Sequence, residues 1–130
     1  MASIFTKIVN GEIPAYKIAE DDRFLAFLDI NPLTKGHTLV IPKQETDYLF
    51  DLDADLYADM QRFAHKIAKA LKPAMQTKRV GVAVIGFEVP HAHLHLIPIN
   101  GMSEMNFSLP KLKLSPAEFE AITAKIKAEL

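Results

Sequence analysis

The sequence predicts an α+β fold, in which an antiparallel sheet of about five strands packs against a long helix and a C-terminal helix. Two observations support this class. Five short segments carry the apolar and β-branched residues of strands, with turn residues or a helix between them. Two other segments have apolar residues at spacings of three and four, the pattern of helices that bury one side. We expect these helices to lie on one face of the sheet.

The first third of the chain predicts a helical turn and three strands. The turn is expected at residues 4–9, and the strands at residues 15–20, 23–29 and 38–42. Asp21 and Asp22 are expected to join the first two strands as a hairpin turn. The third strand is a continuous apolar run, which indicates a central position in the sheet.

A long helix is expected at about residues 54–72. Asp53 has the side chain of a helix N-cap, and Pro73 is expected to end the helix. The residues predicted to face the core are Leu56, Met60, Phe63, Ile67 and Leu71. Further strands are expected at residues 79–85 and 91–97, followed by a long loop at residues 99–114.

The start of the C-terminal helix is predicted by a capping box. Ser115 is the expected cap, Pro116 suits the first helical position, and Glu118 completes the box. The residues expected to face inward are Phe119, Ile122 and Ile126.

The composition describes one domain with a real core. The 130 residues are 49% hydrophobic, with 15 basic and 16 acidic side chains and no cysteine. No basic block predicts a nucleic-acid or anionic-membrane partner, and no apolar run approaches the ~18 residues of a membrane span. Disulfides and thiolate zinc sites are excluded. Without a recognisable secretory signal, a cytoplasmic protein is expected.

Three of the five histidines fall within residues 91–95. His91, His93 and His95 alternate with apolar residues, and in a strand they would share one face at intervals of roughly 7 Å. Imidazoles exchange protons, attack electrophiles and bind metals near neutral pH. Three of them on one face therefore predict an active site.

Two other interpretations of this row stay open. The row can be a structural strand with its polar groups outward. It can also belong to a metal site, because imidazoles two residues apart leave the same face of a strand. The outer two histidines would be on the order of 13 Å apart, so a metal would need two of the three and a further ligand such as His37 or Glu88.

The remaining interpretation is nucleophilic catalysis by an imidazole. A neutral histidine can attack a phosphorus or acyl centre and form a covalent intermediate. Its neighbours would donate hydrogen bonds to the phosphoryl oxygens and protonate the leaving group. His93, with an imidazole on each side, is the best candidate nucleophile.

Residues 91–97 resemble the signature of the histidine triad (HIT) family, which is His-x-His-x-His followed by two hydrophobic residues. Further segments that resemble this family are residues 4–15, 24–32 and 36–43. The similarity covers about residues 3–98 of a single domain at residues 1–130, in the order of the family. The branch it resembles most comprises the Hint-like nucleotide-binding proteins.

This resemblance implies a homodimeric enzyme that hydrolyses or transfers nucleoside monophosphates, with purine nucleoside phosphoramidates or related AMP and GMP derivatives as substrates. His93 would attack the α-phosphorus and form a nucleotidyl-histidine intermediate. His95 and His91 would orient phosphate oxygens or support a proton relay, which His37 would join. No metal or cofactor is expected, because imidazole donors can stabilise the charge on the phosphoryl oxygens.

The resemblance also assigns a set of nucleotide-binding residues. Asp29 matches an acidic residue that accepts hydrogen bonds from both ribose hydroxyls, although it also suits a turn at a strand end. The apolar residues expected to enclose the purine are Phe5, Phe27, Ile30 and Leu39, each of which also suits the core. Gly86 matches a backbone position close to the phosphate, where glycine permits close approach, and it equally suits a turn.

The sequence departs from the family pattern in ways that bear on specificity. Ser3 and Thr6 replace the Cys-x-x-Cys zinc pair of many relatives, so no structural zinc is expected. Glu88 lies near a family position that is often Ser or Gln, and its carboxylate would repel a phosphate, so its backbone N–H is the expected contact. An Asn expected on the preceding strand is absent.

Other functions also stay open. One is a purine-nucleotide-binding regulatory module with little turnover, another is a dinucleoside polyphosphate hydrolase, and a third is a metal-dependent hydrolase. The loop at residues 99–114, with Met102, Met105 and Phe107, is expected to line the substrate entrance, to form the dimer contact, or simply to cover the surface.

Overall fold

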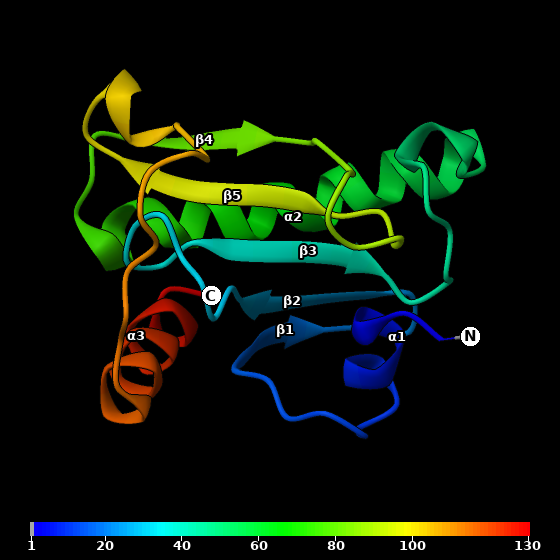
Figure 1. Ribbon diagram of the computed structural model, residues 1–130, viewed down its shortest axis with the longest axis horizontal. Helices are drawn as coiled ribbons and strands as arrows, with labels where there is room; N and C mark the ends of the chain where they lie inside the picture. Colours follow the sequence, from blue (N-terminus) through cyan, green and yellow to red (C-terminus); the bar gives the residue numbers. More distant parts are fainter. Residues whose placement is uncertain (1) are drawn as a thin grey trace.

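The computed structural model describes residues 2–130 and has the predicted α+β architecture, with one five-stranded antiparallel sheet (Figure 1). In chain order the elements are α1 (Ile4–Val9), β1 (Lys17–Glu20), β2 (Phe24–Leu28), β3 (Thr38–Pro42), the 3₁₀ turn η1 (Leu49–Asp51), α2 (Ala54–Met75), β4 (Arg79–Ala83), β5 (Leu94–Ile99), the 3₁₀ turn η2 (Met102–Glu104) and α3 (Pro116–Ala128). The strand order is β1-β2-β3-β5-β4, so β3 holds the predicted central position.

Alternate residues of β2 and β3 point to opposite faces of the sheet and build two separate cores. The residues on the face that packs against α2 and α3 are Phe24, Ala26, Leu28 and Val40. Those on the face that packs against α1 are Leu25, Phe27, Leu39 and Ile41. The prediction of helices on one face holds for α2, which runs behind the sheet in Figure 1, and for α3, whereas α1 covers the opposite face.

The register of the central strands brings residues distant in sequence into one row. Leu39 of β3 pairs with Phe27 of β2 on one side and with His95 of β5 on the other. Because directly opposed residues of antiparallel strands point to the same face, His95 lies on the face that α1 covers. This row positions the site described below.

Helix α2 extends beyond its predicted end. Asp53 caps the helix as expected, but Pro73 lies inside it, and the helix ends at Met75. A proline inside a helix removes one backbone hydrogen bond. The packing of Ala74 and Met75 against the core offsets this loss, and Gln76 in the left-handed conformation, with φ of 54°, ends the helix.

The strands around the histidines are shorter than predicted. β4 ends at Ala83 and β5 begins at Leu94, so His91 and His93 precede the strand. The backbone N–H of His91 donates to the carbonyl of Val89 at 2.8 Å. This local turn satisfies a group that strand pairing would otherwise use, and the segment therefore does not continue the β3 ladder.

Helix α3 begins as predicted. The Ser115 side chain accepts from the Glu118 backbone N–H, and the Glu118 carboxylate accepts from the Ser115 N–H, each at 3.2 Å. Phe119, Ile122 and Ile126 are buried, as expected. Within residues 2–130, no helix combines the length and apolar character needed to cross a bilayer.

Candidate active site

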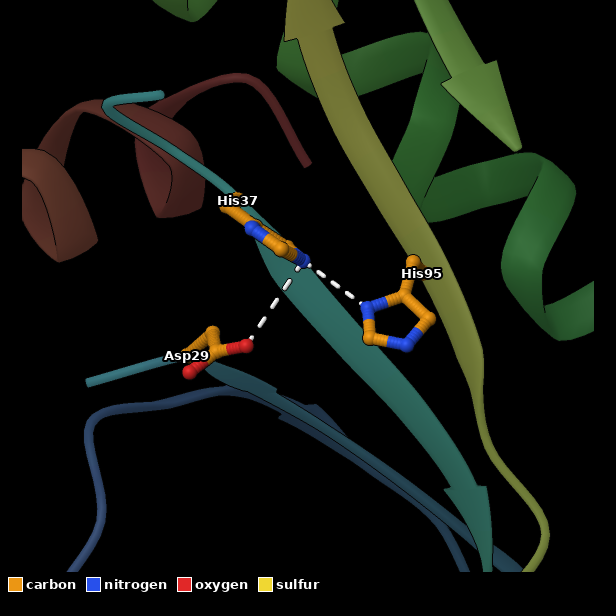
Figure 2. A group of neighbouring side chains, drawn as sticks. All are labelled: Asp29, His37 and His95. Atoms are coloured by element: carbon orange, nitrogen blue, oxygen red, sulfur yellow. Dashed lines mark hydrogen bonds and ion pairs between the residues drawn. The ribbon is translucent and has the colours of Figure 1, made fainter. Parts of the chain in front are cut away.

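His37 and His95 form a hydrogen-bonded pair of imidazoles between neighbouring strands. His37 immediately precedes β3, His95 belongs to β5, and 2.9 Å separates His37 Nε2 from His95 Nδ1 (Figure 2). Asp29, which follows β2, has a carboxylate oxygen 3.7 Å from the same Nε2 atom. The three side chains meet because β2, β3 and β5 are adjacent in the sheet.

The direction of the imidazole hydrogen bond follows from the other side of the His37 ring. The backbone N–H of Leu33 donates to His37 Nδ1 at 3.0 Å, so the neutral ring holds its proton on Nε2. His37 Nε2–H therefore donates to His95 Nδ1. The proton of a neutral His95 is then on Nε2, and His95 presents an N–H donor at the cleft described below.

Both rings of this pair are neutral at pH 7. Burial lowers the pKa of His37 to about 3, and the neighbouring His95 acts in the same direction. Burial also lowers the pKa of His95 to about 4, with a further contribution from His93. Since burial penalises the charged form of an imidazole, this pair acts through hydrogen bonds and not through a positive charge.

His93 has its proton fixed on Nδ1. That atom lies 2.7 Å from the backbone carbonyl oxygen of His91, which can only accept a hydrogen bond. The opposite nitrogen, Nε2, therefore keeps its lone pair in the neutral ring. The ring lies edge-on to Phe5 and to His95, with centroid separations of 5.1 and 4.9 Å. In this tautomer Nε2 is the nitrogen that can act as a nucleophile.

The His91 side chain is enclosed by the protein. Its Nε2 atom lies 2.7 Å from the Pro42 carbonyl and its Nδ1 atom 2.8 Å from Ser3 Oγ. Burial lowers the pKa of His91, so the neutral ring donates to Pro42 and accepts from Ser3. The three imidazoles do not form the single row that strand spacing predicts, because only His93 and His95 reach the cleft.

Residues at the start of α1 hold His91 in place. Ser3 Oγ caps α1 by accepting from the Thr6 N–H at 3.0 Å. The Thr6 hydroxyl and the Ser3 N–H both donate to the Glu45 carboxylate at 2.6 Å. These hydrogen bonds lower the pKa of Glu45 to about 2, and the hydrogen bond from Thr6 contributes the most. The sequence carried no signal for Glu45.

A cleft of about 210 Å³ opens beside His93 and His95, and we call it the nucleoside cleft after the ligand that the sequence predicts for its lining residues. The predicted nucleotide-binding residues that line it are Phe5, Phe27, Asp29, Ile30, Leu39 and Glu88. Phe5, Phe27 and Leu39 are buried, whereas Ile30 is 64% exposed. The cleft thus offers apolar walls with two carboxylates and two imidazoles among them.

Asp29 supplies the polar group of the wall that β2 provides. Its Oδ1 atom accepts from the Asn31 backbone N–H at 2.8 Å, whereas Oδ2 receives no such bond among the described residues. Burial raises the pKa of Asp29, and the negative charge of Glu88 adds to this rise. Oδ2 is therefore available to accept hydrogen bonds from ligand hydroxyls.

A second, smaller cavity of about 130 Å³ adjoins the first at the same two imidazoles, and we call it the Phe107 cavity. Its other walls are Ile85, Gly86, Phe87, Glu88 and Phe107. Gly86 therefore lines this cavity and not the nucleoside cleft, and its φ of +84° favours glycine. The Phe107 ring lies 4.9 Å from that of His95, so the 99–114 loop contributes to the site.

Asp29, His37 and His95 also bring three possible metal-ligand atoms within 4.8 Å of one another. A metal on His37 Nε2 would move the ring proton to Nδ1, toward which the Leu33 N–H already points. Two hydrogens would then face each other, whereas a metal-bound imidazole normally donates its second N–H to an acceptor. The donor directions at His37 therefore disfavour a metal ion on its Nε2 atom.

The sequence matches one known family over most of its length. Residues 10–102 match the HIT domain, and the chain therefore belongs to the HIT family. This result confirms the resemblance drawn from the spacing of the three histidines.

Individual relatives agree with this assignment. The adenosine 5′-monophosphoramidase of Schizosaccharomyces pombe is 36% identical, over 100% of this chain and 99% of its own. A solved Hit-like protein involved in cell-cycle regulation from Bartonella henselae is 34% identical with a TM-score of 0.84, over 98% of this chain and 96% of that chain. A zinc-bound histidine triad family protein from Mycobacterium smegmatis is 32% identical with a TM-score of 0.83, over 99% of this chain and 93% of that chain.

Proposed function

We propose that this protein is a nucleoside phosphoramidase, which releases a nucleoside monophosphate from purine nucleoside phosphoramidates through a covalent intermediate on His93. The observation that carries this proposal is the complementary protonation of two adjacent imidazoles. His93 has a free lone pair on Nε2, and His95 has an N–H donor on Nε2. Similarity to the yeast phosphoramidase over the whole chain supports the same activity.

The nucleoside cleft suits the base and sugar of such a substrate. A purine would pack against the rings of Phe5 and Phe27 and against Leu39, with Ile30 at the exposed rim. The Oδ2 atom of Asp29 would accept hydrogen bonds from the ribose hydroxyls. This orientation would bring the α-phosphate to His93 and His95, which line the same cleft.

In the first step, His93 Nε2 forms a bond with the α-phosphorus, and the bond from phosphorus to the leaving nitrogen breaks. The electron pair of that bond goes to the amine nitrogen, which takes a proton from solvent. The phosphorylated ring of His93 carries a positive charge, which the His91 carbonyl stabilises through the Nδ1–H. The His95 Nε2–H donates to a phosphoryl oxygen as charge develops there.

In the second step, a water molecule attacks the phosphorus and releases the nucleoside monophosphate. The bond from phosphorus to Nε2 breaks, its electron pair returns to His93, and a proton from the water passes to solvent. His37 acts through His95, because it occupies His95 Nδ1 and keeps the donor hydrogen on Nε2. We propose that no metal takes part in either step, in line with the donor directions at His37.

We further propose that the chain forms a homodimer through β4. This strand pairs with β5 on one side only, and Val82 on the strand and Val84 directly after it are exposed. A free strand edge with apolar side chains favours association with a second chain. Analytical ultracentrifugation should show a dimer that Val82→Glu dissociates, and a monomeric wild-type protein would contradict this proposal.

The experiment that tests the activity is hydrolysis of AMP-lysine phosphoramidate by the wild-type protein and by His93→Ala, each with and without EDTA. We expect turnover that is insensitive to EDTA and absent in the variant, while urea unfolding confirms that the variant is folded. Turnover abolished by EDTA would indicate a metal-dependent hydrolase. AMP binding without turnover of any phosphoramidate would indicate a regulatory binding module.

A further inference from the structure

We propose that the Phe107 cavity binds the leaving amine of the substrate, and that the Glu88 carboxylate selects amines that carry a positive charge. This inference rests on the proposed phosphoramidase function and names the class of leaving group. The inference gives a role to Glu88, whose carboxylate lies near the expected position of the phosphate.

The two cavities suit the two parts of the substrate that lie on either side of the phosphorus. Both are lined by His93 and His95, so a phosphorus atom within reach of these imidazoles lies where the cavities meet. Asp29 and the buried aromatic rings line only the nucleoside cleft, which suits the nucleoside. The other substituent of the phosphorus, the leaving nitrogen, is then directed into the Phe107 cavity.

The walls of the Phe107 cavity suit a short alkyl chain. Ile85, Phe87 and Phe107 are apolar, and Phe87 is 92% exposed. Phe107 is held in place because Lys111 Nζ donates to the carbonyls of Phe107 and Leu109. An alkyl chain attached to the leaving nitrogen would cover the exposed Ile85 and Phe87 side chains and gain the free energy of burying them.

The acidic side chain that lines the Phe107 cavity is Glu88. Glu88 is exposed and forms no ion pair within residues 2–130. Its charge also reaches the nucleoside cleft, where it raises the pKa of Asp29. The nearby cation, Lys111, already binds two loop carbonyls. A leaving group with an ammonium would be attracted to Glu88, whereas a carboxylate or a second phosphate would be repelled.

Three AMP phosphoramidates of similar length test this selectivity, with putrescine, pentylamine or γ-aminobutyrate as the leaving amine. We expect kcat/KM to fall in that order for the wild-type protein. Glu88→Gln should reduce the preference for putrescine over γ-aminobutyrate by roughly tenfold, and Glu88→Lys should reverse it. Glu120→Gln, an exposed substitution on α3, serves as the matched control and should leave the preference unchanged.

Phe107→Ala tests the cavity itself. It should lower kcat/KM for all three substrates while the affinity for AMP, which occupies only the nucleoside cleft, stays within about twofold. An unchanged preference in both Glu88 variants, or a loss of AMP affinity equal to the loss of kcat/KM in Phe107→Ala, would overturn the inference. If the wild-type protein turns over none of the three, the proposed function itself fails, and this inference fails with it.

Discussion

The backbone carbonyl of His91 accepts a hydrogen bond from His93 Nδ1 at 2.7 Å, and this contact determines which nitrogen of His93 is free. The His91 ring is in turn held by Pro42 at the end of β3 and by Ser3 at the start of α1. Ser3 and Pro42 therefore position the proposed nucleophile through the His91 ring, although neither residue lines the nucleoside cleft.

Ser3→Ala tests this positioning against an ordinary capping effect. The substitution removes the cap of α1 and the hydrogen bond to His91 Nδ1, so we expect a loss on the order of 1 kcal/mol in unfolding free energy and a fall of roughly tenfold in kcat. Ser115→Ala, which removes the cap of α3 far from the histidines, should show a similar loss of stability with kcat unchanged. Equal kcat values for the two variants would contradict a positioning role for Ser3.

His37→Ala should lower kcat by roughly 10²-fold, because His95 loses the donor that fixes its tautomer. His37→Gln can still donate from its amide to His95 Nδ1 and should recover much of this loss. Affinity for AMP should change little in either variant. If Gln and Ala at this position are equally impaired, the hydrogen bond is not the reason that His37 matters.

The buried histidine pair predicts that stability falls with acid. The unfolded chain takes up protons at His37 and His95 below a pKa of about 6.5. In the folded protein, His95 takes up its proton only near pH 4 and His37 only near pH 3. Because the unfolded state binds more protons in this range, the free energy of unfolding falls as pH falls below 6.5. By pH 5 we expect a loss on the order of 2 kcal/mol for each histidine.

Urea unfolding at pH 7 and pH 5 measures this loss. His37→Gln removes one of the histidines whose pKa burial lowers, while His95 and His91 remain, so its pH dependence should be clearly smaller than that of the wild-type protein. A pH dependence that is unchanged in His37→Gln would show that the histidine pair is not its source.

Asp29→Asn should remove the ability to distinguish ribose from deoxyribose. The wild-type protein should bind AMP roughly tenfold more tightly than 2′-deoxy-AMP, because a ribose hydroxyl donates to a carboxylate oxygen. In Asp29→Asn the two affinities should converge, as measured by calorimetry. A ratio that survives the substitution would place sugar recognition elsewhere.

The sequence was sufficient for the elements whose signals are local. The capping box at Ser115, the N-cap at Asp53 and the apolar run at residues 38–42 each depend on neighbours within a few residues, and each was predicted correctly. The prediction that Pro73 ends the long helix is wrong, because tertiary packing of the last helical turn outweighs one lost hydrogen bond.

The histidine segment shows the limit of predicting a strand from sequence periodicity. A strand pattern over residues 91–97 predicts three imidazoles on one face, but the turn at His91 removes the first two from the strand. The role of Glu45 depends on a contact with Thr6, which is distant in the sequence, so a single sequence carries no signal for it. The sequence left three roles open for the loop that holds Phe107, and the contact of Phe107 with His95 is what brings this residue to the site.

The most direct test of the proposed mechanism is to trap the covalent intermediate on His93. The wild-type protein is mixed rapidly with AMP-lysine phosphoramidate, quenched in alkaline denaturant, and examined by intact-protein and peptide mass spectrometry. We predict an adduct with the mass of one nucleoside monophosphate on His93, formed and lost at rates that match turnover. Turnover without this adduct, or an adduct on a different residue, would contradict it.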